Sequence, residues 1–258
     1  MADGMVNTSL KGQVSEAEWK ARIDLAAMYR LTALYGWDDM IFTHISHRVP
    51  GPEHHFLINP YGFLFEEVTA SSLVKVDMNG EIVADTPYFI NPAGFTIHSA
   101  VHAARDDAHV VMHLHTDDGV AVACQKDGLL PLSQTSMLVR HDLAYHDYEG
   151  VALDHGERER LVADLGNRNS MMLYNHGTLT VGATAADCFL RMFMLERACA
   201  MQVRALTAGR DGVLHGSKEV QEVVKGQSNP QGMGSVAEKL AWPALLRRLD
   251  RQSPGFDT

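Results

Sequence analysis

Residues 109–124 read HVVMHLHTDDGVAVAC, and this stretch decides the interpretation of the chain. The run from Val110 to His115 is apolar and rich in strand-forming residues, so it predicts a buried strand, and the TDDG segment predicts a turn into a short helix. Side chains two residues apart on a strand point to the same face. His113 and His115 therefore lie side by side at the end of this strand, where two imidazoles can bind one metal ion. The alternative is a core histidine satisfied by hydrogen bonds.

A second apolar strand, from Met171 to Tyr174, ends at Asn175-His176-Gly177. His176 is thus placed to be a third ligand from a neighbouring strand end, and the alternative is a turn residue whose ring caps the strand. Three histidines leave one position of a tetrahedral zinc ion open, which is the arrangement of a catalytic site.

The chain holds 14 histidines in all, which is the unusual feature of its composition. His98 and His102 are four residues apart on a predicted helix at 95–104. That spacing can bind metal, but it favours one ring in the core and one near the site. The other candidates lie in or between predicted strands, where strand packing, a surface position or access to a cleft is expected: His44, His47, His54, His55, His141 and His146.

The chain as a whole predicts one compact domain with elements at both ends. Residues 1–14 are expected to be a flexible tail, 15–225 the domain, and 226–258 a linker and a final helix. Further helices are predicted at 15–35, 157–165 and 184–207. Strands are predicted at 41–49, 56–58, 73–76, 138–139, 143–148 and 178–181, and an Asn-Gly turn is expected to pair 73–76 with 81–84.

Charge and cysteine content restrict the partners and the compartment. The 22 basic and 32 acidic residues give a net charge of −10, which argues against nucleic acid and anionic membranes as partners. No apolar run is long enough to span a bilayer, and the N-terminus has no secretory signal pattern. Cys124, Cys188 and Cys199 lie in apolar stretches and predict free thiols in a reducing compartment, so a cytoplasmic location is expected.

The pairing of the two histidine segments, followed by a long helix, resembles the class II aldolase/adducin family, and its adducin-like bacterial branch most of all. The resemblance covers about residues 15–207. Four further phrases carry it in the same order: ASSLVK at 70–75, NPAGFTIHSA at 91–100, GLLP at 128–131 and AYHDY at 144–148.

The resemblance implies an α/β/α single domain around a largely antiparallel, nine-stranded sheet. It implies a divalent metal ion, with zinc the first choice, on His113, His115 and His176. In the sugar-phosphate aldolases of the family, the metal stabilises the enediolate left by carbon–carbon cleavage, and a nearby acidic residue moves the proton. The resemblance also implies a homotetramer with active sites between neighbouring subunits.

This sequence departs from the sugar-phosphate aldolases at three places. Pro92-Ala93-Gly94 stands where the aldolases have Ser-Ser-Glu and the epimerases Ser-Ser-Asp. Thr43-His44 stands where the first phosphate loop has Gly-Asn, and the tyrosine that donates a proton falls near Thr135. The usual carboxylate and the small hydroxyls of a phosphate cradle are therefore missing.

We therefore predict a metal-dependent carbon–carbon lyase that acts on a small unphosphorylated hydroxy- or keto-acid, or on an aromatic acid. It would work by retro-aldol cleavage or by decarboxylation, which needs no base to begin. His44 or His98 would donate the proton, because imidazole titrates near neutral pH. The alternatives are a non-catalytic, adducin-like oligomerisation protein and a sugar-phosphate aldolase or epimerase.

The helix at 184–207 adds an argument for assembly. Its Met and Phe side chains exceed what one core-facing stripe needs, and such residues are enriched at interfaces. The alternative is a helix buried inside one subunit.

Overall fold

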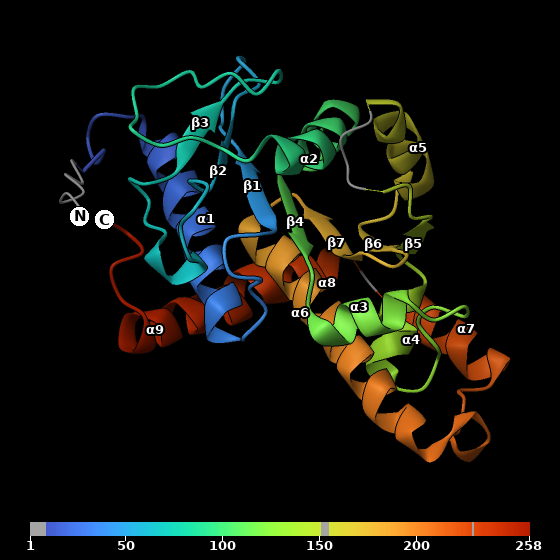
Figure 1. Cartoon of the computed structure of the whole chain (residues 1–258). Helices are drawn as coiled ribbons and strands as arrows, with labels where there is room; N and C mark the ends of the chain where they lie inside the picture. Colours follow the sequence, from blue (N-terminus) through green and yellow to red (C-terminus); the bar gives the residue numbers. More distant parts are fainter. Residues whose placement is uncertain (1–8, 151–154, 229) are drawn as a thin grey trace.

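The computed structural model describes residues 9–150, 155–228 and 230–258 of the chain (Figure 1). Within them lies a seven-stranded sheet of order β3-β2-β1-β4-β7-β6-β5. The strands are β1 (His44–Arg48), β2 (Phe56–Ile58), β3 (Val74–Val76), β4 (Val110–Leu114), β5 (Leu143–His146), β6 (Ser170–Leu173) and β7 (Gly177–Gly182). The two histidine-bearing segments thus lie side by side at the centre of the sheet.

The helices begin at side-chain caps that the sequence carries. Ser15 accepts a hydrogen bond from the Glu18 amide at 3.1 Å, and Thr184 accepts one from the Asp187 amide at 3.2 Å. The α-helices are α1 (Glu16–Leu34), α2 (Pro92–Ala104), α3 (Asp117–Ala123), α4 (Gln134–Arg140), α5 (His155–Leu165), α6 (Ala185–Ala205), α7 (Lys218–Gln227), α8 (Pro230–Val236) and α9 (Trp242–Gln252). A π-helical turn (η4, Ala237–Ala241) joins α8 to α9, and short 3-10 turns lie at η1 (Phe65–Glu67), η2 (Leu206–Ala208) and η3 (Arg210–Gly212).

The expectation of a nine-stranded, largely antiparallel sheet is wrong in its strand count, and the sheet is mixed. β5 pairs in parallel with β6, while the other pairs are antiparallel. The expected pairing of 73–76 with 81–84 is present. Val76 and Ile82 form an antiparallel bridge, the Val83 amide donates to the Lys75 carbonyl at 3.0 Å, and the Asp77 amide donates to the Glu81 carbonyl at 3.0 Å. The second arm remains a bridge rather than a longer strand, and Ile82 in it is 40% exposed.

A second correction concerns residues 138–139, which were expected to form a strand. They lie in α4, because Ser133 caps that helix by accepting a hydrogen bond from the Ser136 amide at 3.0 Å. A two-residue apolar run does not distinguish a strand from a buried helical turn.

Helices cover both faces of the sheet (Figure 1). Met112 and Leu114 of β4 pack into the core formed with α1, α6 and α9. Val111 points to the opposite face and packs with Val101 of α2 and with α5. Because side chains alternate along a strand, His113 lies on the α2 face. β4 therefore contributes Met112 and Leu114 to the core and His113 to the site.

The C-terminal segment returns to the first helix. The stretch at 226–234, expected to be a linker, is largely helical in its described residues, because α7 ends at Gln227 and α8 begins at Pro230. The chain end is held by Arg30, which donates to the Pro254 carbonyl at 2.6 Å, and by the Ala70 amide, which donates to the Phe256 carbonyl at 2.9 Å.

The division of the chain into tail, domain and C-terminal part stays a prediction. Residues 1–8 of the expected tail lie outside the described residues, and the Leu10 amide donates to Ser71 Oγ at 3.0 Å. Nowhere in the described ranges is there a helix with the length and apolarity needed to cross a bilayer.

Candidate metal centre

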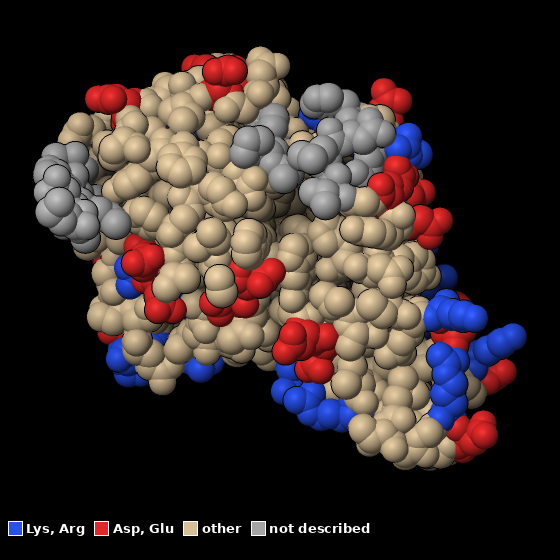
Figure 2. Space-filling model, viewed as in Figure 1, with Lys and Arg blue, Asp and Glu red and all other residues tan. Residues whose placement is uncertain are grey.

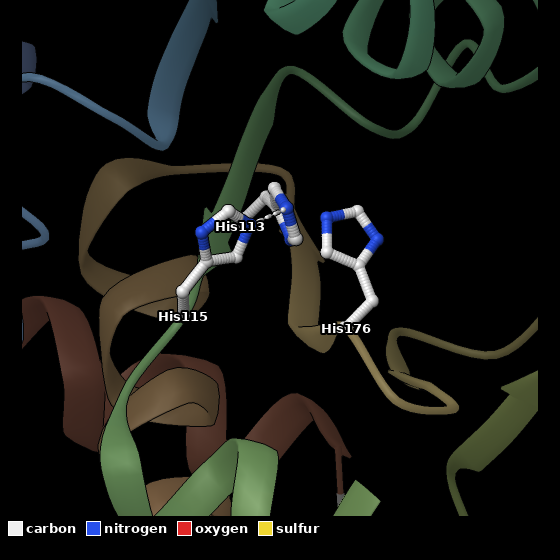
Figure 3. Close-up of side chains that lie close together, drawn as sticks. All are labelled: His113, His115 and His176. Carbon is white, nitrogen blue, oxygen red and sulfur yellow. Dashed lines mark hydrogen bonds between the residues drawn. The ribbon is translucent and has the colours of Figure 1, made fainter. Parts of the chain in front are cut away.

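His113, His115 and His176 converge at one end of the central strands (Figure 3). His113 is in β4, His115 follows it directly, and His176 lies in the turn between β6 and β7. One ligand nitrogen from each ring lies within 4.8 Å of the others. The structure thus brings together the three residues that the sequence proposed as ligands.

The turn that carries His176 is shaped by its two neighbours. Asn175 has φ +57°, a left-handed conformation that asparagine tolerates better than most residues. Gly177 is required for a different reason: a Cβ there would lie 2.2 Å from the Leu114 carbonyl oxygen. Only glycine lets β7 approach β4 this closely, and that approach holds His176 beside His115.

Hydrogen bonds fix the tautomers of two of the rings. His113 Nδ1 lies 2.9 Å from the Thr178 carbonyl oxygen, and His115 Nδ1 lies 3.1 Å from the Asp39 carboxylate. Both partners only accept hydrogen bonds, so each Nδ1 carries the proton. A neutral imidazole that carries its proton on Nδ1 has a free lone pair on Nε2, the form that binds a metal.

His113 Nε2 and His115 Nε2 lie 3.0 Å from each other. Two nitrogen lone pairs at that distance repel unless a proton or a metal cation lies between them. Tetrahedral zinc, with bonds of about 2.0–2.1 Å, separates its ligand nitrogens by about 3.3 Å. The donor set therefore fits a divalent metal, and the Asp39 and Thr178 contacts are of the kind that orient metal-bound histidines.

Burial keeps two of the three rings, His113 and His176, in the form that binds metal. Burial, with the nearby His115 ring, lowers the pKa of His176 to about 4. Burial and the neighbouring His176 and His115 rings lower the pKa of His113 well below its ordinary value. Both rings are neutral at pH 7, and only neutral imidazole ligates a metal.

His44 fills the space beside Gly94. It opens β1 as the register partner of His113 and is buried. A Cβ at Gly94 would lie 2.2 Å from His44 Nδ1 and 2.5 Å from its Cγ. The imidazole therefore occupies the room next to the position where the family's aldolases, by the resemblance, carry their carboxylate.

His98 lies on α2 with its ring edge-on to that of His44, at a centroid separation of 6.2 Å. His102 lies one helical turn further on, buried beside Phe56 at 5.1 Å between ring centroids. His102 is thus the ring in the core and His98 is the ring near the site, which is the division expected from the sequence.

The expectation that His44 and His98 have near-neutral pKa values is wrong. Burial, with the His115 ring, lowers the pKa of His44 to about 4. Burial, with His44 and His102, lowers the pKa of His98 well below its ordinary value. Both rings are neutral at pH 7 and offer lone pairs rather than stored protons. Among the described residues, neither His44 Nε2 nor His98 Nε2 has a hydrogen-bond partner.

The remaining candidate histidines are not members of the three-ligand cluster. His54 is exposed, as expected. The Nδ1 atom of His47 lies 2.7 Å from the Arg48 carbonyl oxygen. His146 Nδ1 lies 2.7 Å from the Asp164 carboxylate. Tyr148 is closer to the cluster, with its ring centroid 6.2 Å from that of His176.

Two elements of the site were not found from the sequence. Asp39 lies in the loop between α1 and β1, 76 residues before the ring that it contacts, and no spacing pattern marks it. The Thr178 contact is made by a backbone carbonyl, which no residue type identifies.

Comparisons with known proteins agree with the fold and the histidine motif. The profile of the Class II Aldolase and Adducin N-terminal domain matches residues 23–203. A Caulobacter vibrioides protein named for the class 2 aldolases is 67% identical over 257 residues, covering 99% of each chain. Mouse alpha-adducin is 41% identical over 269 residues, which cover 97% of this chain and 36% of that protein.

Solved structures extend the comparison. An aldolase II superfamily protein from Pseudomonas syringae has a TM-score of 0.91 at 50% identity and covers 97% of this chain and 100% of its own. L-fuculose 1-phosphate aldolase from Glaciozyma antarctica has a TM-score of 0.80 at 25% identity, with 97% and 96% covered. The chain belongs to the class II aldolase and adducin family, which includes metal-dependent aldolases.

Proposed function

We propose that this protein is a metal-dependent lyase that breaks a carbon–carbon bond in a small, unphosphorylated hydroxy- or keto-acid, or in an aromatic acid. The observation that carries the proposal is the convergence of three imidazoles: His113 Nε2 and His115 Nε2 lie 3.0 Å apart, with His176 beside them. Three histidines leave one position of a tetrahedral ion open, which is the arrangement of a catalytic site.

His113, His115 and His176 would hold the ion. Three nitrogen donors favour zinc over magnesium, which prefers oxygen. When bound, the ion supplies a Lewis acid that stabilises negative charge on a substrate oxygen. Asp39 keeps the His115 ring in place by accepting its Nδ1 proton at 3.1 Å.

His44 takes the place beside the metal centre that an acidic residue holds in the aldolases. Its Nε2 is buried and has no partner among the described residues, so a substrate group can take that position. Because the ring is neutral, it can form a hydrogen bond with the substrate there and adds no negative charge.

The presence of His44 at this place also argues against a phosphorylated substrate. A phosphate cradle is built from backbone amides and small hydroxyls. Here the His44 imidazole and Pro92 stand at the corresponding places, and His44 closes the space over Gly94. Sugar-phosphate aldolase chemistry is therefore the weaker assignment.

We further propose a cytoplasmic homotetramer with active sites between subunits. Many apolar residues of α6, such as Phe189 and Met192, are buried inside the chain, so they belong to its own core. Phe193, Met194 and Met201 remain half-buried and are the candidates for a subunit contact. On the face seen in Figure 2 acidic groups lie across the lower middle, and Lys and Arg side chains at the lower right are interspersed with acidic ones.

The second candidate is an adducin-like oligomerisation protein, favoured by the 41% identity with alpha-adducin. A substrate screen separates the two. Zinc-loaded protein would be incubated with hydroxy-acids, keto-acids and aromatic carboxylates, and release of aldehyde or CO2 would be measured beside His176→Ala. We expect release from at least one compound, abolished in the variant. Equal rates in both proteins would contradict the proposal.

A further inference from the structure

A chain of hydrogen bonds runs from the core to the His98 ring, and it begins at His102. His102 Nδ1 lies 2.9 Å from the Ala108 carbonyl oxygen. That oxygen only accepts, so Nδ1 carries a proton. His102 is 2% exposed, and burial lowers its pKa to about 3, so the ring is neutral. Its Nε2 is therefore an acceptor.

Ser46 joins the two rings. Its Oγ lies 2.8 Å from His102 Nε2 and 2.7 Å from His98 Nδ1. A hydroxyl has one hydrogen to donate. Because His102 Nε2 can only accept, Ser46 donates to it and must accept from His98. His98 therefore carries its proton on Nδ1.

This leaves His98 Nε2 as a bare acceptor on the side of the ring away from Ser46. The His98 side chain is fully buried, and its Nε2 has no hydrogen-bond partner among the described residues. An unpaired buried acceptor destabilises the protein unless a ligand donates to it. The ring lies against His44, the register partner of His113, so this acceptor is beside the metal centre.

We propose that Ser46 and His102 are positioning residues that hold His98 with Nε2 as an acceptor, so that the site selects a substrate with a hydroxyl group and cleaves it by retro-aldol chemistry. The inference rests on the proposed lyase function and narrows it. Decarboxylation removes no hydroxyl proton and has no use for this acceptor. Retro-aldol cleavage begins when an acceptor takes the hydroxyl proton of the substrate.

The bond changes balance without a co-reactant. His98 Nε2 takes the proton of the β-hydroxyl, and the O–H electrons form the carbonyl of the released aldehyde. The carbon–carbon bond breaks, and its electron pair passes to the other fragment as an enolate. Return of the proton to that carbon gives the second product and restores His98. Substrate atoms are divided between two carbonyl products.

Two variants of His102 distinguish the relay from a merely structural role. His102→Phe keeps a ring beside Phe56 but removes the acceptor. Ser46 is then free to donate to His98 Nδ1, and the His98 proton should move to Nε2. His102→Gln keeps an acceptor for Ser46 and should retain the original tautomer.

Neutron diffraction from deuterated crystals of the metal-loaded protein locates the proton. We expect deuterium on His98 Nδ1 in the wild type and in His102→Gln, and on Nε2 in His102→Phe. Deuterium on Nε2 in the wild type, or no change in His102→Phe, would overturn the relay.

Ligand binding gives the second readout. By calorimetry, 4-hydroxy-2-oxobutanoate should bind the wild type about tenfold more tightly than 2-oxobutanoate, the value of one hydrogen bond. His102→Phe should lose this preference and His102→Gln should keep it. An equal affinity of the wild type for both acids overturns the hydroxyl selection. Failure of the proposed lyase function would give a different result from failure of the relay. The protein would then bind no metal, while the tautomers of His98 and His102 stayed as described.

Discussion

Gly94→Ala is the substitution whose outcome depends most on the placement of His44. The new Cβ would lie 2.2 Å from His44 Nδ1 and 2.3 Å from its Cε1. Ordinary contact needs about 3.4 Å, so the ring must move by about 1 Å. Overpacking of this kind costs about 1–3 kcal/mol. Alanine in a helix gains up to about 1 kcal/mol over glycine, which the clash outweighs.

The double-mutant cycle isolates the contact. In a His44→Ala background the obstructing ring is gone, and Gly94→Ala should then stabilise the protein by about 0.5–1 kcal/mol. The helix gain is common to both backgrounds and cancels, so the coupling between the two positions is expected to equal the clash, about 1–3 kcal/mol. Urea unfolding of the four proteins, followed by circular dichroism, measures it.

Gly234→Ala is the matched control, because Gly234 also lies in a helix and nothing lies within 4 Å of its would-be Cβ. It should stabilise the protein by up to about 1 kcal/mol whichever residue stands at position 44. If Gly94→Ala stabilised the wild type as much as Gly234→Ala does, the placement of His44 over Gly94 would be refuted.

The remaining predictions concern pH, ligand orientation and assembly. Burial lowers the pKa of His44 to about 4 and of His102 to about 3, while unfolded histidine titrates near about 6.5. As the pH falls, the unfolded state therefore binds protons before the folded state does. The unfolding free energy should fall by about 1.4 kcal/mol for each ring and each pH unit from about pH 6 to 4. A urea midpoint that stays unchanged over that range would count against neutral buried rings. Asp39→Asn should weaken zinc binding about 10–100-fold in a chelator competition, with Asp38→Asn as the control, and equal affinities would exclude the orienting role. Sedimentation should give four times the monomer mass; a stable and fully active monomer would contradict the tetramer.

Much of the metal centre follows from local pattern. The alternation of side chains on an apolar strand is enough to put His113 and His115 on one face, and the end of the next strand locates His176. Helix starts at Ser15 and Thr184 follow from side-chain caps that act within one turn. These features depend on neighbours a few residues away, which the sequence displays.

Other features depend on contacts between distant segments. Asp39 reaches His115 only through the path of the loop before β1. The low pKa of His44 results from burial, which the sequence does not report. The tautomer of His98 is set by Ser46 and His102 together, although the resemblance points only to the phrase around His98.

The metal content of the purified protein tests the central claim most directly. Wild-type protein, dialysed against metal-free buffer, would be compared with His176→Ala and with His215→Ala, an exposed histidine outside the cluster, by inductively coupled plasma mass spectrometry. We predict one divalent ion per chain in the wild type and in His215→Ala, and loss of the ion in His176→Ala. Full metal content in His176→Ala, or none in the wild type after zinc loading, would contradict the account.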